Sequence, residues 1–254
     1  MSRFRTAYAI SFLTGFCLLL IYAFENYHPN LMWIFASGFP PVLSGAVVFT
    51  SVIALKRYWA GPGSKLAQPW ICFAVGLGFW FFGELTWGIY SLVLNVDIPY
   101  PSLADAFWLI GYIPLLLALV LYLLLMRPAI SMKVFVTAFA IVLVIGAVFS
   151  TLVLVPAVTE EAETLVKLID IAYPLLDLIM LALSTMGLMI FAKSKLETTW
   201  LLLNAGFIMF VLGDSMFSYA TANGLYYDGH PLELFFHLGD LLLILAFYVH
   251  IKSL

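Results

Sequence analysis

Residues 103–126 read LADAFWLIGYIPLLLALVLYLLLM, and Asp105 is the single charged side chain among them. A helix needs about 20 mostly apolar residues to cross the hydrocarbon core of a bilayer, so this stretch is long enough to span one. Outward from it, similar apolar stretches recur along the chain, separated by short polar connections. They predict transmembrane helices at 7–24, 31–54, 69–94, 103–126, 132–154, 165–192, 199–222 and 232–251.

These stretches are expected to be helices, because lipid leaves no partner for an unpaired backbone amide and the runs lack the alternation of a barrel strand. The chain is 64% hydrophobic and 10% charged, whereas soluble domains are about 25% charged. This composition excludes a water-soluble fold. We therefore predict an all-α integral membrane protein with eight transmembrane helices, forming a single transmembrane domain over residues 1–254.

The basic residues are distributed unevenly between the predicted connections. All but Lys167 fall at the two termini or in the connections after the second, fourth and sixth spans: Arg3, Arg5, Lys56, Arg57, Lys65, Arg127, Lys133, Lys193, Lys195 and Lys252. The opposite connections carry acidic residues: Glu25, Asp97, Glu160, Glu161, Glu163 and Asp228. Because cytoplasmic loops are enriched in Lys and Arg, both termini are predicted to be cytoplasmic, in a multi-pass protein of the cell membrane.

The chain also matches itself. A shift of 130 residues aligns Trp70 with Trp200, Gly76 with Gly206, Gly83 with Gly213, and Glu84 with Asp214. A shift of 128 residues aligns Asp105 with Glu233, Phe107 with Phe235, Gly111 with Gly239, and Ala118 with Ala246. The second and sixth spans share a proline in mid-helix, Pro41 and Pro174.

These matches predict two four-helix repeats, over about 1–127 and 128–254. An even number of spans in each half makes the halves parallel, related by a pseudo-twofold axis along the membrane normal, with a site expected at their interface. The competing explanation is chance similarity between apolar helices.

Seven acidic residues fall inside the predicted spans, in the extracytoplasmic half of each: Glu84, Asp105, Asp170, Asp177, Asp214, Glu233 and Asp240. A carboxylate at the bilayer centre costs about 2.5–3.5 kcal/mol, so these groups should face the bundle interior or a water-filled cavity. There they would be protonated, hydrogen-bonded to one another, or paired with a histidine, an ion or a cationic ligand.

The acidic residues fall into two groups. Ser102 and Asp105 have the spacing of a capping box, and Glu233 follows Pro231 into a first helical turn, so these acids are expected to be structural. The candidate ligand-binding residues are Glu84, Asp177, Asp214, Asp240, His237, Tyr173 and Trp87. We expect the four acids to converge on one extracytoplasmic cavity, and interhelical hydrogen bonding is the alternative. No metal-ligand pattern is present, and no cofactor is assigned.

Four stretches carry a resemblance to a known family: PYPSLADAFWLIGYIPLLLAL, YPLLDLIMLALS, TTWLLLNAGFIMFVLGDSMFSY and GLYYDGHPLELFFHLGDLLLILAF. Together they resemble the eight-helix membrane input region that precedes GGDEF-type diguanylate cyclase, PAS or histidine kinase modules in bacterial and archaeal signalling proteins. The resemblance covers about residues 70–250.

The acidic motif positions of that family fall here on Asp105, Asp177, Asp214 and Glu233, and Phe236 stands where the family usually has tryptophan. The resemblance implies a sensory role. The sequence ends at Leu254 after the last predicted span, so the expectation is a stand-alone member or an input region separated from its output module.

The leading hypothesis is a sensor or receptor-like module that binds a small ligand, ion or proton from outside and passes a helix rearrangement to a cytoplasmic partner. An intramembrane enzyme acting on a lipid or isoprenoid is less expected. It is considered because HPLELFF at 230–236 resembles the PLEE-x-FF stretch of carotenoid-type lycopene cyclases, with Leu234 in place of the paired acid. A small-molecule or ion transporter is the third class. The candidate partners are the lipid bilayer, a small cationic or neutral ligand, a cytoplasmic signalling protein and a second copy of the chain. No nucleic acid is expected.

Overall fold

The computed structural model describes residues 4–59, 64–96, 98–127, 130–149 and 163–253, and these form helices and connections without any strand. The long helices are α1 (Arg5–Ala23), α2 (Pro29–Tyr58), α3 (Ala67–Gly88), α4 (Leu103–Leu125), α5 (Met132–Phe149), α7 (Thr164–Phe191), α8 (Glu197–Ala222) and α9 (Leu234–Ser253). The shorter ones are η2 (Glu25–Tyr27), η3 (Ile89–Leu94) and η6 (Pro231–Glu233). The predicted fold class, all-α, is confirmed for the described residues.

Seven of the helices in the described part of the chain are long and apolar enough to cross a membrane. Their outer faces expose large apolar side chains such as Phe12, Val42 and Leu117, which water would not favour. These are the properties of a helical, multi-pass membrane protein. The described part of α5 is shorter than a span, and residues 150–154 of the predicted fifth span lie outside the described residues. The total of eight spans therefore stays a prediction.

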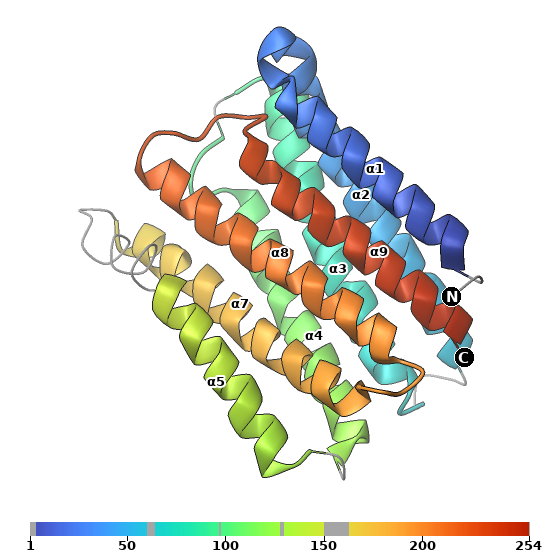
Figure 1. Cartoon of the computed structure of the whole chain (residues 1–254). Coiled ribbons are helices and arrows are strands. Elements are labelled where there is room, and N and C mark those ends of the chain that lie inside the picture. The colour runs from blue at the N-terminus through green and yellow to red at the C-terminus, as the bar shows by residue number, and fades with distance from the viewer. Residues whose placement is uncertain (1–3, 60–63, 97, 128–129, 150–162, 254) are drawn as a thin grey trace.

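The helices pack as a bundle in which α1 and α5 lie at opposite edges (Figure 1). Between them, α3 packs on α4 and α8 packs on α9, while α2 and α7 contact both pairs. Helix α1 lies against α9, and α5 lies against α7. The core that positions the site is therefore built from six helices, three from each half of the chain.

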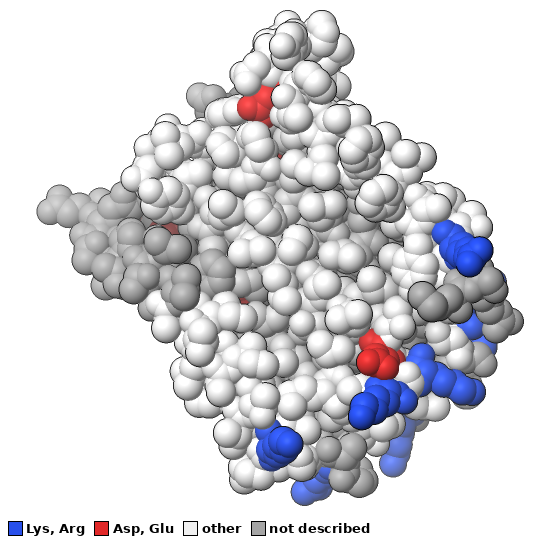
Figure 2. Space-filling model, viewed as in Figure 1, with Lys and Arg blue, Asp and Glu red and all other residues white. Residues whose placement is uncertain are grey.

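Lysine and arginine side chains gather at one end of the bundle, where both chain ends lie (Figures 1 and 2). We call this the basic end. It holds the start of α1, the end of α9 and the α2–α3, α4–α5 and α7–α8 connections. Lys167, at the start of α7, lies at the other end. The predicted loop residues Arg3, Asp97, Glu160 and Glu161 lie outside the described residues, and the orientation in the membrane stays a prediction.

Glycines bring the helices of each pair close together. A Cβ added to Gly76 of α3 would lie 2.9 Å from the carbonyl oxygen of Gly111 in α4. A Cβ added to Gly206 of α8 would lie 3.3 Å from the carbonyl oxygen of Gly239 in α9. Helices in lipid associate through van der Waals packing rather than the hydrophobic effect, so such close approach is what holds each pair.

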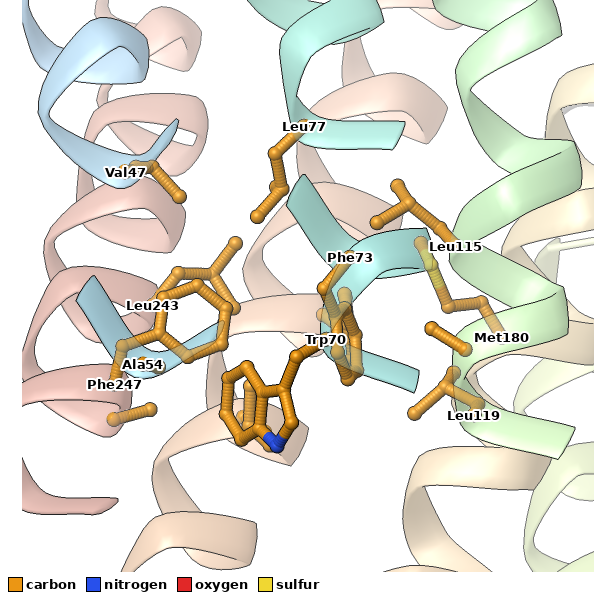
Figure 3. Close-up of a cluster of buried hydrophobic side chains, with 14 of the residues drawn as sticks. Val47, Ala54, Trp70, Phe73, Leu77, Leu115, Leu119, Met180, Leu243 and Phe247 are labelled. Carbon is orange, nitrogen blue, oxygen red and sulfur yellow. The ribbon is translucent and has the colours of Figure 1, made fainter. Parts of the chain in front are cut away.

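The half of the bundle nearer the basic end is filled by apolar side chains centred on Trp70 (Figure 3). Six of its aromatic side chains come from six different helices, and we call them the aromatic layer: Tyr58, Trp70, Tyr122, Phe191, Trp200 and His250. Trp70 stacks on Tyr58 with ring centroids 5.8 Å apart, and Trp200 stacks on Phe191 at 5.3 Å. This half of the bundle is therefore closed by packing.

The last turns of the third predicted span depart from an α-helix. Residues Ile89–Leu94 form a π-helix, a form common at functional sites. The turn begins at Gly88, where an added Cβ would lie 2.6 Å from the carbonyl oxygen of Ser37 in α2. It places Ser91 Oγ 2.8 Å from Ser37 Oγ, which ties α2 to the end of α3.

Candidate ligand-binding cavity

A cavity of about 150 Å³ lies in the half of the bundle away from the basic end. Its acidic lining residues are Glu84, Asp105, Asp214, Asp228, Glu233 and Asp240. Its aromatic lining residues are Trp80, Trp87, Tyr100, Trp108, Tyr112, Tyr173, Phe210, Phe217, Tyr226 and Phe236. No lysine or arginine of the described chain lines it, so its walls combine carboxyl groups with aromatic rings, and His237 is their one histidine among the described residues.

Six of the seven predicted site residues line this one cavity: Glu84, Asp214, Asp240, His237, Tyr173 and Trp87. Asp177 does not. It is 1% exposed and lies behind the wall, hydrogen-bonded to the lining residue Tyr112. The expectation that all four acids reach the cavity directly is therefore corrected for Asp177. Its carboxyl group lies against the hydroxyl of Tyr112, which is itself a lining residue on the facing helix.

Three tyrosine–aspartate hydrogen bonds join α7 to α4 and to the segment just before it. These are Tyr112 to Asp177 at 2.6 Å, Tyr173 to Asp105 at 3.1 Å, and Tyr100 to Asp170. The predicted common face of Asp170, Tyr173 and Asp177 is thus the face that α7 turns toward α4. Both of its acids accept a hydrogen bond from a phenol.

Tyr112 also connects two carboxyl groups. Its hydroxyl lies 2.6 Å from Asp177 Oδ1 and 3.2 Å from Asp214 Oδ2, and the two carboxyl groups are themselves hydrogen-bonding neighbours. Two carboxylates in contact, away from water and without a basic partner, are stable when they share a proton. We call this group, Asp177, Tyr112 and Asp214, the carboxyl triad.

The predicted capping box at the start of α4 is confirmed. The Ser102 side chain accepts from the Ala104 amide at 3.2 Å, and Asp105 Oδ2 accepts from the Ser102 amide at 2.7 Å. Asp105 additionally accepts from Tyr173, so the cap also fixes α4 against α7. Both roles are structural.

Glu233 is held by three donors. Its carboxylate accepts from Tyr22 at 2.8 Å, from the Gly229 amide at 2.8 Å and from Tyr226 at 3.1 Å. Since the single Tyr22 proton goes to Glu233, the Tyr22 oxygen accepts from His237 Nε2, 2.8 Å away. His237 is therefore a donor in a chain that links α9 to α1.

The connection between α8 and α9 contributes two further lining residues. Burial raises the pKa of the Asp228 carboxyl, and the hydrogen bond from Ser91 Oγ, at 3.4 Å, acts in the opposite direction. Burial, together with the nearby charges of Glu233 and Asp228, raises the pKa of the Tyr226 hydroxyl. Tyr226 therefore keeps its proton and remains a hydrogen-bond donor at neutral pH.

Glu84 faces a different environment from the triad. Its hydrogen-bonding neighbour is Trp108, and the Trp108 ring packs against Trp87 with centroids 5.9 Å apart. Trp80, one turn before Glu84, packs edge-on against Phe210 at 5.0 Å. Glu84 is thus the carboxyl group most surrounded by indole rings.

Tyr112 is the functional residue that sequence reasoning missed. A signal for it existed, because the shift of 128 residues that aligns Gly111 with Gly239 also aligns Tyr112 with Asp240. Trp108, which was not among the predicted site residues either, also lines the cavity.

Neither a metal-binding arrangement in the described residues nor a similar known protein indicates the class of site. Within the part of the chain that the structure describes, no group of three His, Cys, Asp or Glu side chains is arranged to hold a metal ion. Searches against protein-family models, curated proteins and solved structures found no match for the chain. The function is therefore argued from the cavity itself.

Proposed function

We propose that the chain is a sensory, receptor-like module of the cell membrane that binds a small ligand from the extracytoplasmic side and signals to a cytoplasmic partner. The observation that carries this proposal is the position of the cavity, in the half of the bundle away from the basic end. Its lining comes from α2, α3, α4, α7, α8 and α9. A ligand there would contact both helix pairs at once, so it could favour one arrangement of the bundle over another.

The proposed orientation places the basic end in the cytoplasm, as the Lys and Arg bias favours, so the cavity faces the other side. The proposed architecture has eight spans in two parallel halves. The similar close contacts of Gly76 with Gly111 and of Gly206 with Gly239 support those halves. A site between two halves is the usual place for a ligand in repeat-built membrane proteins.

The proposed class is the membrane input region that precedes cyclase, PAS and kinase modules. Of the acidic motif positions on which the resemblance rests, Asp105, Asp214 and Glu233 line the cavity and Asp177 lies directly behind it. The resemblance and the cavity thus involve the same residues. A transporter would need access from the basic end as well, where the aromatic layer closes the bundle.

The proposal can be tested with the full chain in lipid nanodiscs. A library of small neutral, anionic and cationic compounds is screened by thermal shift on wild type and on Glu84→Gln, with Glu197→Gln at the basic end as control. Nitroxide labels at Lys65→Cys and Lys195→Cys, in a background without Cys17 and Cys72, then report the distance between the α2–α3 and α7–α8 connections. A compound that stabilises wild type and the control, but not Glu84→Gln, is expected to change that distance.

A bound compound that leaves the label distance unchanged would contradict the sensor. If the same compound accumulated inside proteoliposomes, the chain would instead be a transporter. If a lipid or isoprenoid were converted to a product of different mass, or to an isomer separable by chromatography, the chain would be an enzyme.

A further inference from the structure

Asp240 differs from the other carboxyl groups around the cavity. It is 8% exposed and lines the cavity, yet no donor in the described chain forms a hydrogen bond with its carboxyl group. The charged group that acts on it most directly is Glu84, another acid. A buried carboxylate without a donor is costly, so its partner is expected to come from outside the chain.

The other acids of the site each have at least one hydrogen-bonding neighbour in the described bundle. Asp177 and Asp214 share the Tyr112 hydroxyl, and Glu233 accepts three hydrogen bonds. Asp105 accepts from its own helix start and from Tyr173. Among the acids that line the cavity, Asp240 is therefore the one whose carboxyl group has no hydrogen-bond donor within the described residues.

The internal repeat makes the contrast sharper. Asp240 occupies the position that corresponds to Tyr112, and Glu84 corresponds to Asp214. The shift that aligns Pro41 with Pro174 places Ser44 opposite Asp177, and the Ser44 hydroxyl donates to the backbone of its own helix, 3.3 Å away. Where one half of the cavity has a phenol between two acids, the other half has Asp240 in place of that phenol, and Glu84 has Trp108 as its hydrogen-bonding neighbour while Asp240 has none.

The walls around Glu84 and Asp240 determine what kind of partner fits. Aromatic rings from four helices line the same cavity: Trp80, Trp87, Trp108, Phe210, Phe217 and Phe236. The faces of such rings attract cations, most strongly organic ammonium groups removed from water. A metal ion would prefer more oxygen ligands than two carboxylates and aromatic faces supply.

From these observations we propose that Glu84 and Asp240 bind a small organic ammonium ion, with the indole and phenyl rings enclosing its alkyl groups. The assignment rests on the proposed function, because it names the ligand class of that same cavity. The carboxyl triad is then the fixed wall of the site, and the Glu84–Asp240 side is the part completed by the ligand.

The test uses the full chain in nanodiscs with methylammonium, tetramethylammonium and choline as probes. The uncharged isostere of choline, 3,3-dimethylbutan-1-ol, is the matched control ligand. Binding is followed by tryptophan fluorescence, to which Trp80, Trp87 and Trp108 contribute, and by calorimetry. At least one ammonium probe should bind, and choline should bind more tightly than its isostere. Glu84→Gln and Asp240→Asn should each weaken ammonium binding at least about tenfold.

Two controls separate binding from folding. Glu197→Gln removes a carboxylate at the basic end and should leave ammonium binding unchanged. Asp240→Asn should raise the thermal stability of the ligand-free protein, because it removes a buried acid that has no donor. A structural role for Asp240 predicts the opposite change.

The outcomes distinguish this inference from the proposed function. Equal binding of choline and its isostere, or undiminished ammonium binding by both acid variants, overturns the ammonium site and leaves a sensor of another ligand in place. No response to any of the three probes also overturns it. Charge-selective binding without any change in the label distance at the basic end upholds the ammonium site and contradicts the sensor.

Discussion

At the scale of single residues, the Tyr112 hydroxyl is the donor on which the carboxyl triad depends. Tyr112→Phe keeps the ring and removes the hydrogen bond to Asp177, which is buried and accepts from no other phenol within the described residues. Leaving a buried acceptor unsatisfied costs about 1–3 kcal/mol, so the variant should unfold that much more easily. Reversible unfolding in mixed micelles would measure the loss.

The matched control lies in the same helix. Tyr122 packs in the aromatic layer, and its hydroxyl forms no hydrogen bond within the described chain, so Tyr122→Phe should change the free energy of unfolding by less than about 0.5 kcal/mol. Equal losses from the two substitutions would show that the triad contributes no more than ring packing.

What could be predicted about single residues depended on distance along the chain. The role of Asp105 was predictable because a capping box is local, with both partners inside one turn. The donor for Asp177 was not, because Tyr112 lies 65 residues away and the pairing of α4 with α7 is decided by packing. The missing hydrogen-bond donor at Asp240 was equally unpredictable, because it depends on which side chains the neighbouring helices α1, α2 and α8 place near α9.

At the scale of helices, the α3–α4 contact tolerates no side chain at Gly76. A methyl group there would meet Leu115 Cγ at 2.6 Å and the Gly111 carbonyl oxygen at 2.9 Å. Gly76→Ala should therefore destabilise the bundle by about 1–3 kcal/mol, as overpacking usually does. The same unfolding assay measures this, together with the binding of any ligand found for the cavity.

Two further glycines calibrate the Gly76 result. Gly78 has nothing within 4 Å of an added Cβ, so Gly78→Ala should be neutral or stabilise the helix by up to about 1 kcal/mol. At Gly206 the nearest atoms are 3.2 Å and 3.3 Å away, so Gly206→Ala should give an intermediate loss. A Gly78→Ala loss as large as that of Gly76→Ala would argue against close helix contact as the cause.

The helices themselves were predictable to within a few residues, because long apolar runs have few alternatives in lipid. Helix α2 departs from its predicted bounds, 31–54, because it extends over Pro29–Tyr58. It continues through Pro40 and Pro41 without a break. The π-helix at Ile89–Leu94 was not predictable. It depends on the close approach of Gly88 to α2, which no local pattern indicates.

At the scale of the whole molecule, the orientation in the membrane is the main prediction. Lys65 lies in the connection between α2 and α3, and Leu225 lies between α8 and α9, at opposite ends of the bundle. In a background without Cys17 and Cys72, Leu225→Cys should react with a membrane-impermeant maleimide on intact cells. Lys65→Cys should react only after the cells are opened. The reverse pattern would place the cavity in the cytoplasm.

The arrangement of the whole bundle was partly predictable. The aligned glycines Gly76 and Gly206 each lie close to a carbonyl oxygen of the neighbouring helix, that of Gly111 and that of Gly239, and the two-repeat architecture stays a prediction. Helices α1 and α5 were less predictable. α1 contacts α9 in the other half of the chain, whereas α5 contacts α7 within its own half, and neither contact leaves a periodic signal in the sequence.

The tyrosine–carboxylate contacts also bear on how the protein is synthesised. Tyr112 in α4 leaves the ribosome before Asp177 and Asp214, and Tyr22 in α1 leaves it long before Glu233 in α9. Because chains fold from the N-terminus as they are made, each of these phenols is already in the bilayer when its acid is inserted. In these contacts the earlier helix supplies the hydrogen-bond donor that the later, acid-bearing helix needs.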